Sequence, residues 1–566
     1  MLETAVATEF ELGSNLRDSA AGAGWSFVLP SLQLERLICL GAPSEATLST
    51  LTRLARSIVI WCPDRRHRRR LLALVEKRGW AHVAVEATLP EPPRSPEDGF
   101  DLVCLSPDAV RSLRGGDGLR LVPALLRPDG HAYLDLSGRA ARRMGRILVD
   151  GLARDGFSEA RWLWQTPQRG EVRAAAPAAF PDVTRYLVDH DLHRPSSPGG
   201  LVDRVVRLVG GTHARTHPTH RAGVVVGAAG AAGGGEVPRY VADLAHEAGI
   251  DLSGYRWGLS ARGRYNSRKA VFVLFGGTGS PEYVVKMTRD PRLNHRLENE
   301  HRALTLLRRD NFGEADTYPQ ARFFGYHGGL AILGQNALGG EAFERRITGA
   351  DGCPYPGAAA GWLTELAAAT AQPAPPGPGV DDALGRLLES YGRLYAPGPD
   401  ERAFLAEQVA ALGSVPFPAV FQHGDPGTWN LLVTPTDRVA FLDWEAAEPH
   451  GLPLWDLFHF FRSYGMLASR RAGIRDPHDG FVRQFLSDTP VSRVLAQSLE
   501  LYLSRLSLPA DLIGPLFVTG WMHRALKEAT RLTADRLAQG HYVRLLRLSI
   551  SERHDPYLRR LLSTPR

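Results

Sequence analysis

The stretch that decides the fold of this chain is HGDPGTWN at residues 423–430, which is followed by FLDWE at residues 441–445. The first segment contains an acid and an amide, Asp425 and Asn430, and the second contains another acid, Asp443. The apolar runs NLLV and VAFLDW flank the polar TPTDR, which is typical of two β-strands joined by a turn. Such a hairpin would place Asn430 and Asp443 opposite one another at its open end.

This order of residues predicts a centre for ATP-dependent phosphoryl transfer. In the pattern H-x-D-x-x-x-x-N, the Asp accepts the proton of a hydroxyl group, while the Asn and a later Asp hold magnesium against the nucleotide phosphates. We therefore expect Asp425 as the catalytic base and Asn430 and Asp443 as metal ligands. The alternative is an ordinary turn and strand end, since Asp, Asn and Gly are common in loops. The agreement of order, spacing and hairpin favours the catalytic interpretation.

The composition describes a globular protein with more than one domain. A chain of 566 residues exceeds a single core, and its 44% hydrophobic and 23% charged residues are ordinary for a soluble protein. The net charge of +6 is small, and the basic run RRHRRR at residues 65–70 has no aromatic platform beside it, so we expect no nucleic-acid partner. The N-terminal MLETAVATEFELG lacks signal-peptide features, and no run approaches about 20 apolar residues. We expect a cytoplasmic location without membrane insertion.

Residues 35 to about 178 alternate short apolar runs with helical stretches, which predicts a parallel sheet with helices on both faces. FSEARWLWQTP and EVRAAAPA flank a turn at residues 168–170 and predict an antiparallel hairpin. Five parallel strands with such a hairpin resemble the class I methyltransferase fold, and LLRPDGHAYLDL at residues 125–136 strengthens the resemblance. The resemblance places Asp64 where such folds hold a ribose.

The loop after the first strand departs from that family. ICLGAPSEAT at residues 38–47 lacks the spaced glycines that let a backbone approach a ligand closely. We therefore expect residues 1–194 to form a degenerate methyltransferase-like Rossmann domain that supports structure, docks a partner or presents substrate. The alternative is a domain that still binds S-adenosylmethionine. Residues 195–236 are rich in Gly, Pro and Ala and predict a linker on both sides of a short apolar stretch.

A Gly-containing turn and a rare lysine suggest the nucleotide side of the site. Residues 258–275 suit two strands joined by a turn over nucleotide phosphates, with Gly263 and Asn266 as candidate nucleotide-binding residues. Taken alone, such turns are more often ordinary hairpins. The next strand, PEYVVKMTRD, carries Lys286, and the chain contains only four lysines. The position of Lys286 therefore favours a functional role over a solvated surface.

The segment RLENEHRALTLLRR has the apolar period of a helix and contains Glu298 and Glu300. A strand Lys paired with a helix Glu holds its ammonium toward the α- and β-phosphates. We prefer Glu300 as the partner of Lys286, because it lies one helical turn before Leu304, a candidate for the core. The alternative is a surface Lys and a solvated helix face.

GGLAILGQNALGG at residues 328–340 predicts a strand leading into a hinge between two lobes. Backbone groups of Gln335, Asn336 and Ala337 would then contact adenine. A simple strand and turn is the alternative on these residues alone.

Residues 237–566 resemble the aminoglycoside phosphotransferase and choline kinase superfamily, a branch of the protein-kinase-like fold, through HGDPGTWN, FLDWE, Lys286 and Glu300. The resemblance implies an α+β bilobal kinase-like fold, with an N-lobe at 237–337 and a helical C-lobe at 338–566. The whole chain is thus expected to combine an α/β Rossmann-like domain with a kinase-like domain.

The same resemblance implies further roles. His423 would brace the catalytic loop, Glu445 would lie near the metal, and Asp456 is expected to be a helix cap. Asp443 is followed by Trp-Glu where a protein kinase has Phe-Gly, and no A-P-E follows, which favours a small hydroxylated substrate.

We expect transfer of the γ-phosphoryl group of ATP or GTP, with Mg²⁺, to a hydroxyl of a sugar-like or amino-alcohol-like metabolite. A nucleotide-binding pseudoenzyme or scaffold, and a bifunctional protein with residual S-adenosylmethionine-dependent methyltransferase activity, are the alternatives. The residues leave open the acceptor, the choice between ATP and GTP, the biological purpose and the oligomeric state.

Overall fold

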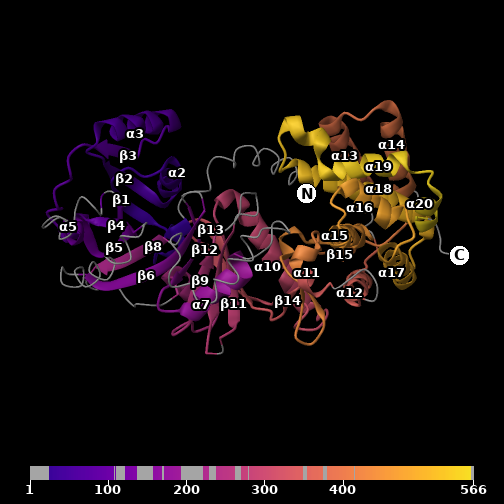
Figure 1. Cartoon of the computed structure of the whole chain (residues 1–566), viewed down its shortest axis with the longest axis horizontal. Helices are drawn as coiled ribbons and strands as arrows, with labels where there is room; N and C mark the ends of the chain where they lie inside the picture. Colours follow the sequence, from indigo (N-terminus) through magenta and orange to yellow (C-terminus); the bar gives the residue numbers. More distant parts are fainter. Residues whose placement is uncertain are drawn as a thin grey trace. The chain divides into compact units, whose positions relative to one another are not determined.

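The computed structural model divides the chain into two compact units. The described residues are 24–106, 109, 121–136, 157–168, 171–192, 221–228, 237–261, 269–277, 279–347, 353–373, 379–413 and 415–562. One unit contains the described residues of Arg17–Asn294 and Arg322–Ala337, and the other contains those of His295–Ala321 and Leu338–Arg566. Figure 1 traces the elements of each unit along the chain.

Five parallel strands open the sheet of the first unit. They are β1 (Leu34–Leu40), β2 (Ala55–Trp61), β3 (Val83–Glu86), β4 (Phe100–Leu105) and β5 (Leu126–Leu136). Their spatial order is β5-β4-β1-β2-β3, the order of doubly wound α/β folds. The connecting helices α2 (Glu45–Leu54) and α3 (Arg65–Arg78) bury Leu48, Leu51 and Leu71 in one core with strand residues. The predicted parallel sheet of five strands is confirmed.

Antiparallel strands extend this sheet. β6 (Phe157–Gln168) and β7 (Glu171–Pro177) form the predicted hairpin. β8 (Arg221–Ala228) pairs antiparallel with both β5 and β6. Residues 221–228 lie inside the Gly-, Pro- and Ala-rich region 195–236, where the sequence analysis expects a linker on both sides of a short apolar stretch. Their GVVV run is β-branched and suits a strand, although the surrounding Gly and Pro residues dominate the local composition.

The same sheet continues into the region predicted as the N-lobe. Its further strands are β9 (Arg256–Ser260), β10 (Lys269–Phe275), β11 (Pro281–Thr288), β12 (Ala321–His327) and β13 (Leu330–Asn336). β7 pairs with β9 through Ala174 opposite Ser260 and Ala175 opposite Leu259. The helix α9 (Arg239–Glu247) precedes β9, and Tyr240 on it donates a hydrogen bond to the carbonyl of Phe27 at 2.6 Å. Both regions therefore belong to one continuous sheet in the described part of the chain.

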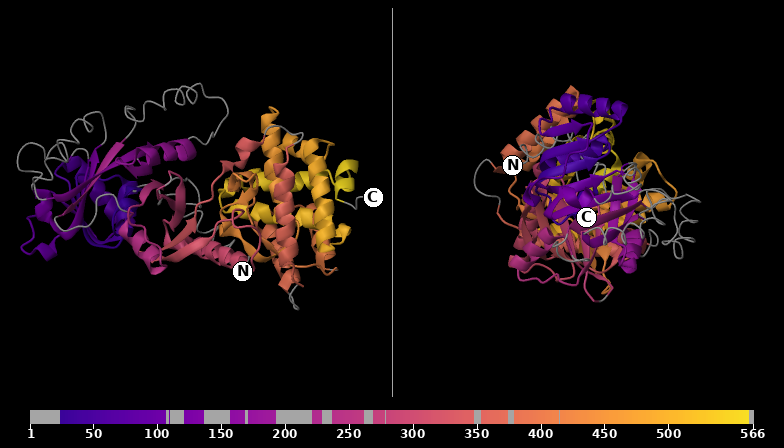
Figure 2. Two further views of the ribbon diagram at one scale, coloured as in Figure 1. Left: turned by 90° about the horizontal axis from the view of Figure 1, so that it is seen from below. Right: turned by 90° about the vertical axis from the view of Figure 1, so that its left-hand side faces the viewer.

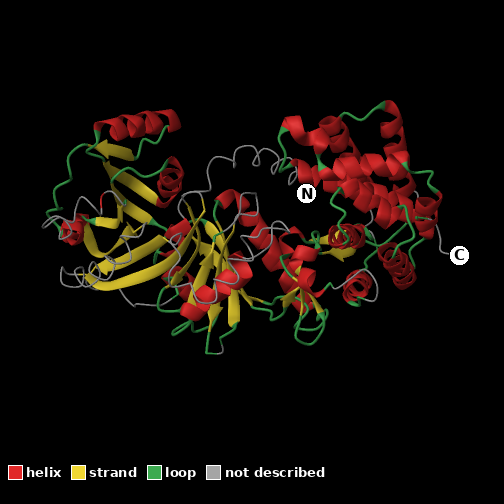
Figure 3. Cartoon of the chain, viewed as in Figure 1, coloured by secondary structure: helices red, strands yellow, loops and turns green. Residues whose placement is uncertain are grey.

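The second unit is mainly helical, as Figure 3 shows for the chain after residue 338. Its helices are α10 (Asn294–Arg309), α11 (Phe343–Arg346), α12 (Tyr355–Thr370), α13 (Gly379–Tyr395), α14 (Pro399–Gly413), α15 (Trp455–Arg471), α16 (Pro477–Phe485), α17 (Pro490–Leu506), α18 (Ile513–Ala529), α19 (His541–Ser551) and α20 (Pro556–Leu561). The long helices pack side by side, among them α12 with α17 and α14 with α18 (Figure 2). The predicted helical character of residues 338–566 is confirmed.

Short strands lie within this helical unit and flank the loop at residues 423–430. They are β14 (Glu341–Ala342), β15 (Val420–Gln422), β16 (Leu431–Val433), β17 (Val439–Phe441) and β18 (Glu448–Gly451). β15 pairs with β18, and β16 pairs with both β14 and β17. None of the described helices combines the length and the apolar character that a membrane crossing requires.

Candidate active site

The loop at residues 423–430 connects β15 to β16 and is held by the side chain of Asp456. The backbone N–H of His423 donates to Asp456 Oδ2 at 2.6 Å, and that of Gly424 donates to Asp456 Oδ1 at 3.1 Å. Gly424 has a φ of +78°, and a Cβ there would lie 1.9 Å from the carbonyl oxygen of Ala446. Only glycine fits this position, because it combines the left-handed conformation with a close backbone approach.

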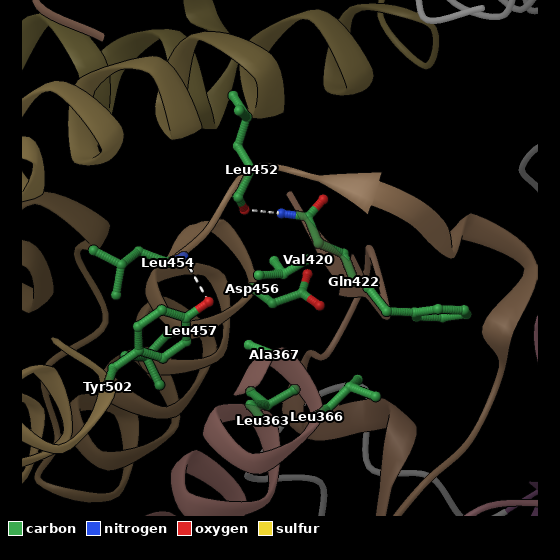
Figure 4. Close-up of a pocket in the computed structure, with 11 residues that line it drawn as sticks. Leu363, Leu366, Ala367, Val420, Gln422, Leu452, Leu454, Asp456, Leu457 and Tyr502 are labelled. Atoms are coloured by element: carbon green, nitrogen blue, oxygen red, sulfur yellow. Dashed lines mark hydrogen bonds between the residues drawn. The ribbon is translucent and has the colours of Figure 1, made fainter. Parts of the chain in front are cut away.

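The predicted cap role of Asp456 is therefore wrong. Leu454 is the N-cap residue of α15, and Asp456 stands in the first turn and accepts hydrogen bonds from backbone N–H groups of the loop at residues 423–430. Figure 4 shows Asp456 among apolar side chains, including Leu366 and Val420, at a small cavity. Burial among these groups raises the pKa of Asp456 to about 6, although the two backbone donors act against the shift.

Asp425 projects from this loop with its two carboxylate oxygens in different surroundings. Oδ2 accepts from Asn430 Nδ2 at 3.3 Å and from Trp429 Nε1 at 3.4 Å. Oδ1 accepts from His459 Nε2 at 3.0 Å and from Arg524 Nη2 at 2.9 Å. Burial alone would raise the pKa of Asp425, but the hydrogen bond from His459 and the charge of Arg524 hold it well below its usual range. Asp425 is thus a carboxylate at neutral pH.

The helices α15 and α18 supply partners of Asp425 that the sequence analysis missed. Arg524 also donates to the carbonyl of Gly424 at 2.9 Å, and Lys527 donates to the same oxygen at 3.3 Å. Burial lowers the pKa of His459 to about 4, so its neutral ring donates through Nε2 to Asp425. Two features of the sequence could have pointed to these partners. Lysine is rare in this chain, which singles out Lys527, and His459 lies three residues after Asp456.

The ring of His423 contacts both the loop and the residue after β17, and its predicted supporting role in catalysis stays a prediction. Its ring is fully buried, and burial lowers its pKa to about 4, so the imidazole is neutral. Nε2 lies 2.9 Å from the carbonyl oxygen of Leu442, and Nδ1 accepts from the backbone N–H of Asp425 at 3.2 Å. One neutral tautomer, protonated at Nε2, satisfies both contacts. His423 thereby ties the loop to the second strand of the hairpin.

The hairpin forms as predicted, but its register differs by one residue. Leu431 pairs with Phe441, and the N–H of Leu442 donates to the carbonyl of Asn430 at 2.8 Å. Asn430 is therefore opposite Leu442, and not opposite Asp443. Asp443 leaves the strand conformation with φ 67° and ψ 68°, a left-handed backbone that is uncommon for a residue other than glycine. Such a conformation is frequent at functional sites and changes the direction of the side chain that follows a strand.

The helix α10 contacts the segment that follows Asp443. Asn299 Nδ2 donates to the carbonyls of Glu445 and Ala447 at 3.0 and 2.9 Å. The carboxylate of Glu445 lies 3.8 Å from Arg296, and its predicted role near the metal stays a prediction. Glu300 on the same helix is fully buried.

Lys286 lies on β11 in the first unit, where it pairs with Val271 and Leu333 on the neighbouring strands. The predicted partnership of Lys286 with Glu300 stays a prediction.

The residues predicted to contact adenine lie at the end of β13. Gln335 is buried, and Asn336 is the last residue of the strand. The N–H of Ala337 donates to the carbonyl of Glu282 at 2.7 Å, and the predicted contact of these residues with adenine stays a prediction. Gly263 and Asn266 lie outside the described residues.

The predicted ribose residue of the first domain has a structural role. Asp64 is the N-cap of α3, and its carboxylate accepts from the N–H of His67 at 2.7 Å. The same carboxylate lies 2.9 Å from His67 Nδ1. These contacts give Asp64 a helix-capping function that needs no cofactor.

Residues 261–494 match the model of the phosphotransferase enzyme family, APH. The match covers less than half of the chain. The comparison with curated proteins gave no match.

Three solved structures match parts of the chain at low identity. Macrolide 2'-phosphotransferase MphH from Brachybacterium faecium is 19% identical over 53% of this chain and 96% of its own, with a TM-score of 0.35. Choline kinase LicA from Streptococcus pneumoniae is 14% identical over 52% and 93%, with a TM-score of 0.34. The bifunctional kinase-methyltransferase WbdD is 15% identical over 84% of each chain, with a TM-score of 0.22. Similarities this low identify no acceptor for this chain.

Proposed function

We propose that this protein transfers the γ-phosphoryl group of ATP or GTP to a hydroxyl group of a small polar acceptor. The observation that carries the proposal is the arrangement of Asp425, whose carboxylate is ionised, about one quarter exposed and fixed on a braced loop. The family match of residues 261–494 supports the same reaction class.

Asp425 would act chiefly by orienting the acceptor. Phosphoryl transfer passes through a loose transition state in which positioning and charge stabilisation contribute most of the rate. A carboxylate with a depressed pKa is a weak base, but it is a strong acceptor for the hydroxyl hydrogen of the attacking group. The proton then leaves late, when the bond to phosphorus has formed.

Magnesium fits the residues that follow Asp425. Asn430 Nδ2 donates to the backbone carbonyl of Asp425 at 2.9 Å, which leaves Oδ1 as the atom that can bind a cation. Oδ1 of Asn430 and the carboxylate of Asp443 would together offer oxygen ligands, and Mg²⁺ prefers oxygen ligands. A bound Mg²⁺ would neutralise charge on the nucleotide phosphates.

Asp425→Asn tests this function. The amide keeps the volume of the side chain but loses the negative charge, so we expect turnover to fall about 10²–10⁴-fold while nucleotide binding persists. Phosphoryl transfer is measured with radiolabelled ATP against a panel of hydroxylated metabolites. Full turnover by Asp425→Asn on an acceptor of the wild-type protein would remove Asp425 from this role.

The same assays separate the two other interpretations. A pseudoenzyme or scaffold predicts nucleotide binding without any acceptor-stimulated, magnesium-dependent turnover. A residual methyltransferase predicts binding of S-adenosylmethionine by the first unit, which calorimetry at millimolar ligand detects. The loop after β1 is poor in glycine, and Asp64 caps the helix α3. Both observations argue against binding of S-adenosylmethionine by the first unit.

A further inference from the structure

The Rossmann-like region of the first unit, meaning its described residues from 24 to 192, shares a hydrophobic core with the strands β9 to β13. One cluster of buried side chains joins the two, and among its members are Trp25, Leu37, Ile60, Trp257, Met287 and Ile332. At the same boundary, the backbone N–H of Leu32 donates to His327 Nε2 at 3.0 Å. Separating the two regions would expose this apolar surface to water, so we expect them to fold as one body.

The turn that leads from β11 into α10 is built around the buried carboxylate of Asp290. Asp290 is the N-cap of the 3₁₀ turn at Pro291–Leu293, and its side chain is 4% exposed. Oδ1 accepts from the backbone N–H and from Nε of Arg292 at 3.1 and 2.9 Å, and Oδ2 accepts from Nη2 of Arg292 at 2.7 Å. These partners are two residues apart, so their contacts fix the shape of the turn without fixing its place in the unit.

Arg53 supplies the long-range contact to Asp290. Its Nη1 donates to Asp290 Oδ2 at 3.2 Å from the last turn of α2, 237 residues earlier in the chain. The helix α2 is itself fixed, because Leu48 and Leu51 are fully buried in the shared core. Burial would raise the pKa of Asp290, but the hydrogen bonds from Arg292 and the charge of Arg53 hold it below its usual value. Asp290 is thus an ionised carboxylate that ties the turn to α2.

The first residue of α10 is anchored to the neighbouring strands. Oδ1 of Asn294 accepts from Thr288 Oγ1 at 2.6 Å and from the backbone N–H of Ala331 at 3.0 Å. Nδ2 of Asn294 donates to the carbonyl of Gly329 at 2.8 Å. The start of α10 is therefore held in the first unit by the sheet and, through the carboxylate of Asp290, by α2.

The same helix carries residues that the proposed reaction uses. Asn299 binds the segment that follows Asp443, and Glu300 is the predicted partner of Lys286. In protein kinases, the placement of the corresponding helix decides whether the strand Lys is held ready for the nucleotide phosphates. Hydrogen bonds run along the whole of α10, so a displaced first turn would shift Asn299 and Glu300 as well.

We propose that Arg53 is a positioning residue for the nucleotide: it holds Asp290, and with it the start of α10, so that the helix is aligned for nucleotide binding. This inference rests on the proposed function and adds to it a residue from the Rossmann-like region. It gives that region a role that requires neither S-adenosylmethionine nor a partner protein.

Nucleotide affinity tests the proposal without turnover. Calorimetry measures the Kd of β,γ-imido-ATP with Mg²⁺ for the wild-type protein and for Arg53→Met, which removes the charge and keeps an unbranched side chain. We expect the Kd of Arg53→Met to be about three- to tenfold higher, because the start of the helix loses its tie to α2. Arg53→Lys keeps the charge and should retain more of the affinity. An unchanged Kd for Arg53→Met would overturn the proposal.

Arg56→Met is the matched control. It removes an exposed arginine three residues later, which pairs with the exposed Glu35, and it should bind the nucleotide like the wild-type protein. An equal rise in Kd for Arg56→Met and Arg53→Met would show a general effect of charge and would contradict the role of Arg53.

Hydrogen exchange reports the anchoring itself. Peptides that cover residues 289–300 should exchange their amide hydrogens faster in Arg53→Met than in Arg56→Met, because the first turn of α10 opens more often. In an Asp290→Asn background, Arg53→Met should add no further increase, since the carboxylate that Arg53 pairs with is absent. Unchanged exchange in Arg53→Met would overturn the proposal whatever its nucleotide affinity.

The outcomes separate this proposal from the proposed function. Nucleotide binding that depends on Arg53, without transfer to any acceptor, would refute phosphoryl transfer and leave the positioning role in place. Transfer with the same KM for ATP in Arg53→Met and the wild-type protein would keep the proposed function and refute the positioning role. A loss of folded protein alone would lower kcat and leave KM unchanged, so a rise in KM for ATP with a constant KM for the acceptor identifies a displaced helix. No nucleotide binding by the wild-type protein would refute both proposals.

Discussion

Replacement of Asp456 by Asn should change the pH dependence of stability in a defined direction. The folded pKa of Asp456 is about 6 against a usual value of 3.8, so the folded state binds a proton more readily than the unfolded state between these values. By linkage, this group makes stability fall as the pH rises through that window. A shift of about two pKa units corresponds to about 3 kcal/mol.

Asp456→Asn removes this contribution to the pH dependence of stability, because the amide is neutral at every pH. The free energy of unfolding of the variant should therefore decline less than that of the wild-type protein between pH 4 and pH 7, by about 3 kcal/mol. The amide has one acceptor oxygen for the N–H groups of His423 and Gly424, which the carboxylate receives on two oxygens. We expect the looser loop to lower kcat about tenfold at pH 8.

Urea denaturation, followed by tryptophan fluorescence at a series of pH values, measures the first effect, and the phosphoryl-transfer assay measures the second. Asp511→Asn, at an exposed position, is the matched control and should follow the wild-type curve. If the curves of Asp456→Asn and the wild-type protein stay parallel to within about 0.5 kcal/mol over this range, the burial cost assigned to Asp456 is refuted.

Three further substitutions test other parts of the site. Asn tolerates the left-handed backbone at position 443, so Asp443→Asn should keep the local fold. In calorimetry, we expect it to weaken binding of the magnesium–nucleotide complex about tenfold or more and to leave binding of the metal-free nucleotide unchanged. An equal loss of affinity with and without Mg²⁺ would contradict a metal role. Asn299→Ala removes two hydrogen bonds from α10 to the segment after Asp443 and should lower the free energy of unfolding, measured by urea denaturation, by about 1–3 kcal/mol. An unchanged free energy of unfolding would show that these contacts are dispensable. Trp429 is 42% exposed beside Asp425, so Trp429→Ala should raise KM for the acceptor several-fold while KM for ATP stays constant; a rise in the latter alone would place the ring on the nucleotide side.

Local patterns predicted the hairpin and the five parallel strands because period, turn residues and apolar runs act over a few neighbouring positions. The same local reasoning misplaced the strand register of Asn430 and Asp443 by one residue, because a residue with a left-handed backbone follows the strand. It assigned no strand to residues 221–228, because the partners of this strand lie in β5 and β6, far away in sequence. The composition of the surrounding sequence does not indicate which strands a segment will pair with.

Asp456 shows a different reason for failure. Its position at the start of a helical pattern favoured a cap, which is a contact within a few residues. The observed partners, the N–H groups of His423 and Gly424, lie more than thirty positions earlier, with separations of 33 and 32 residues. A long-range polar contact of this kind leaves no periodic signal.

The sequence by itself determined the identity, order and spacing of Asp425, Asn430 and Asp443, because one loop and one hairpin carry all three. Only the tertiary structure decided what surrounds Asp425. His459 and Arg524 reach its carboxylate from positions 34 and 99 residues away, and they keep its pKa well below the usual range. The physical reason is that hairpins form through neighbouring residues, whereas the field at a buried carboxylate is the sum of charges that folding brings together from distant helices.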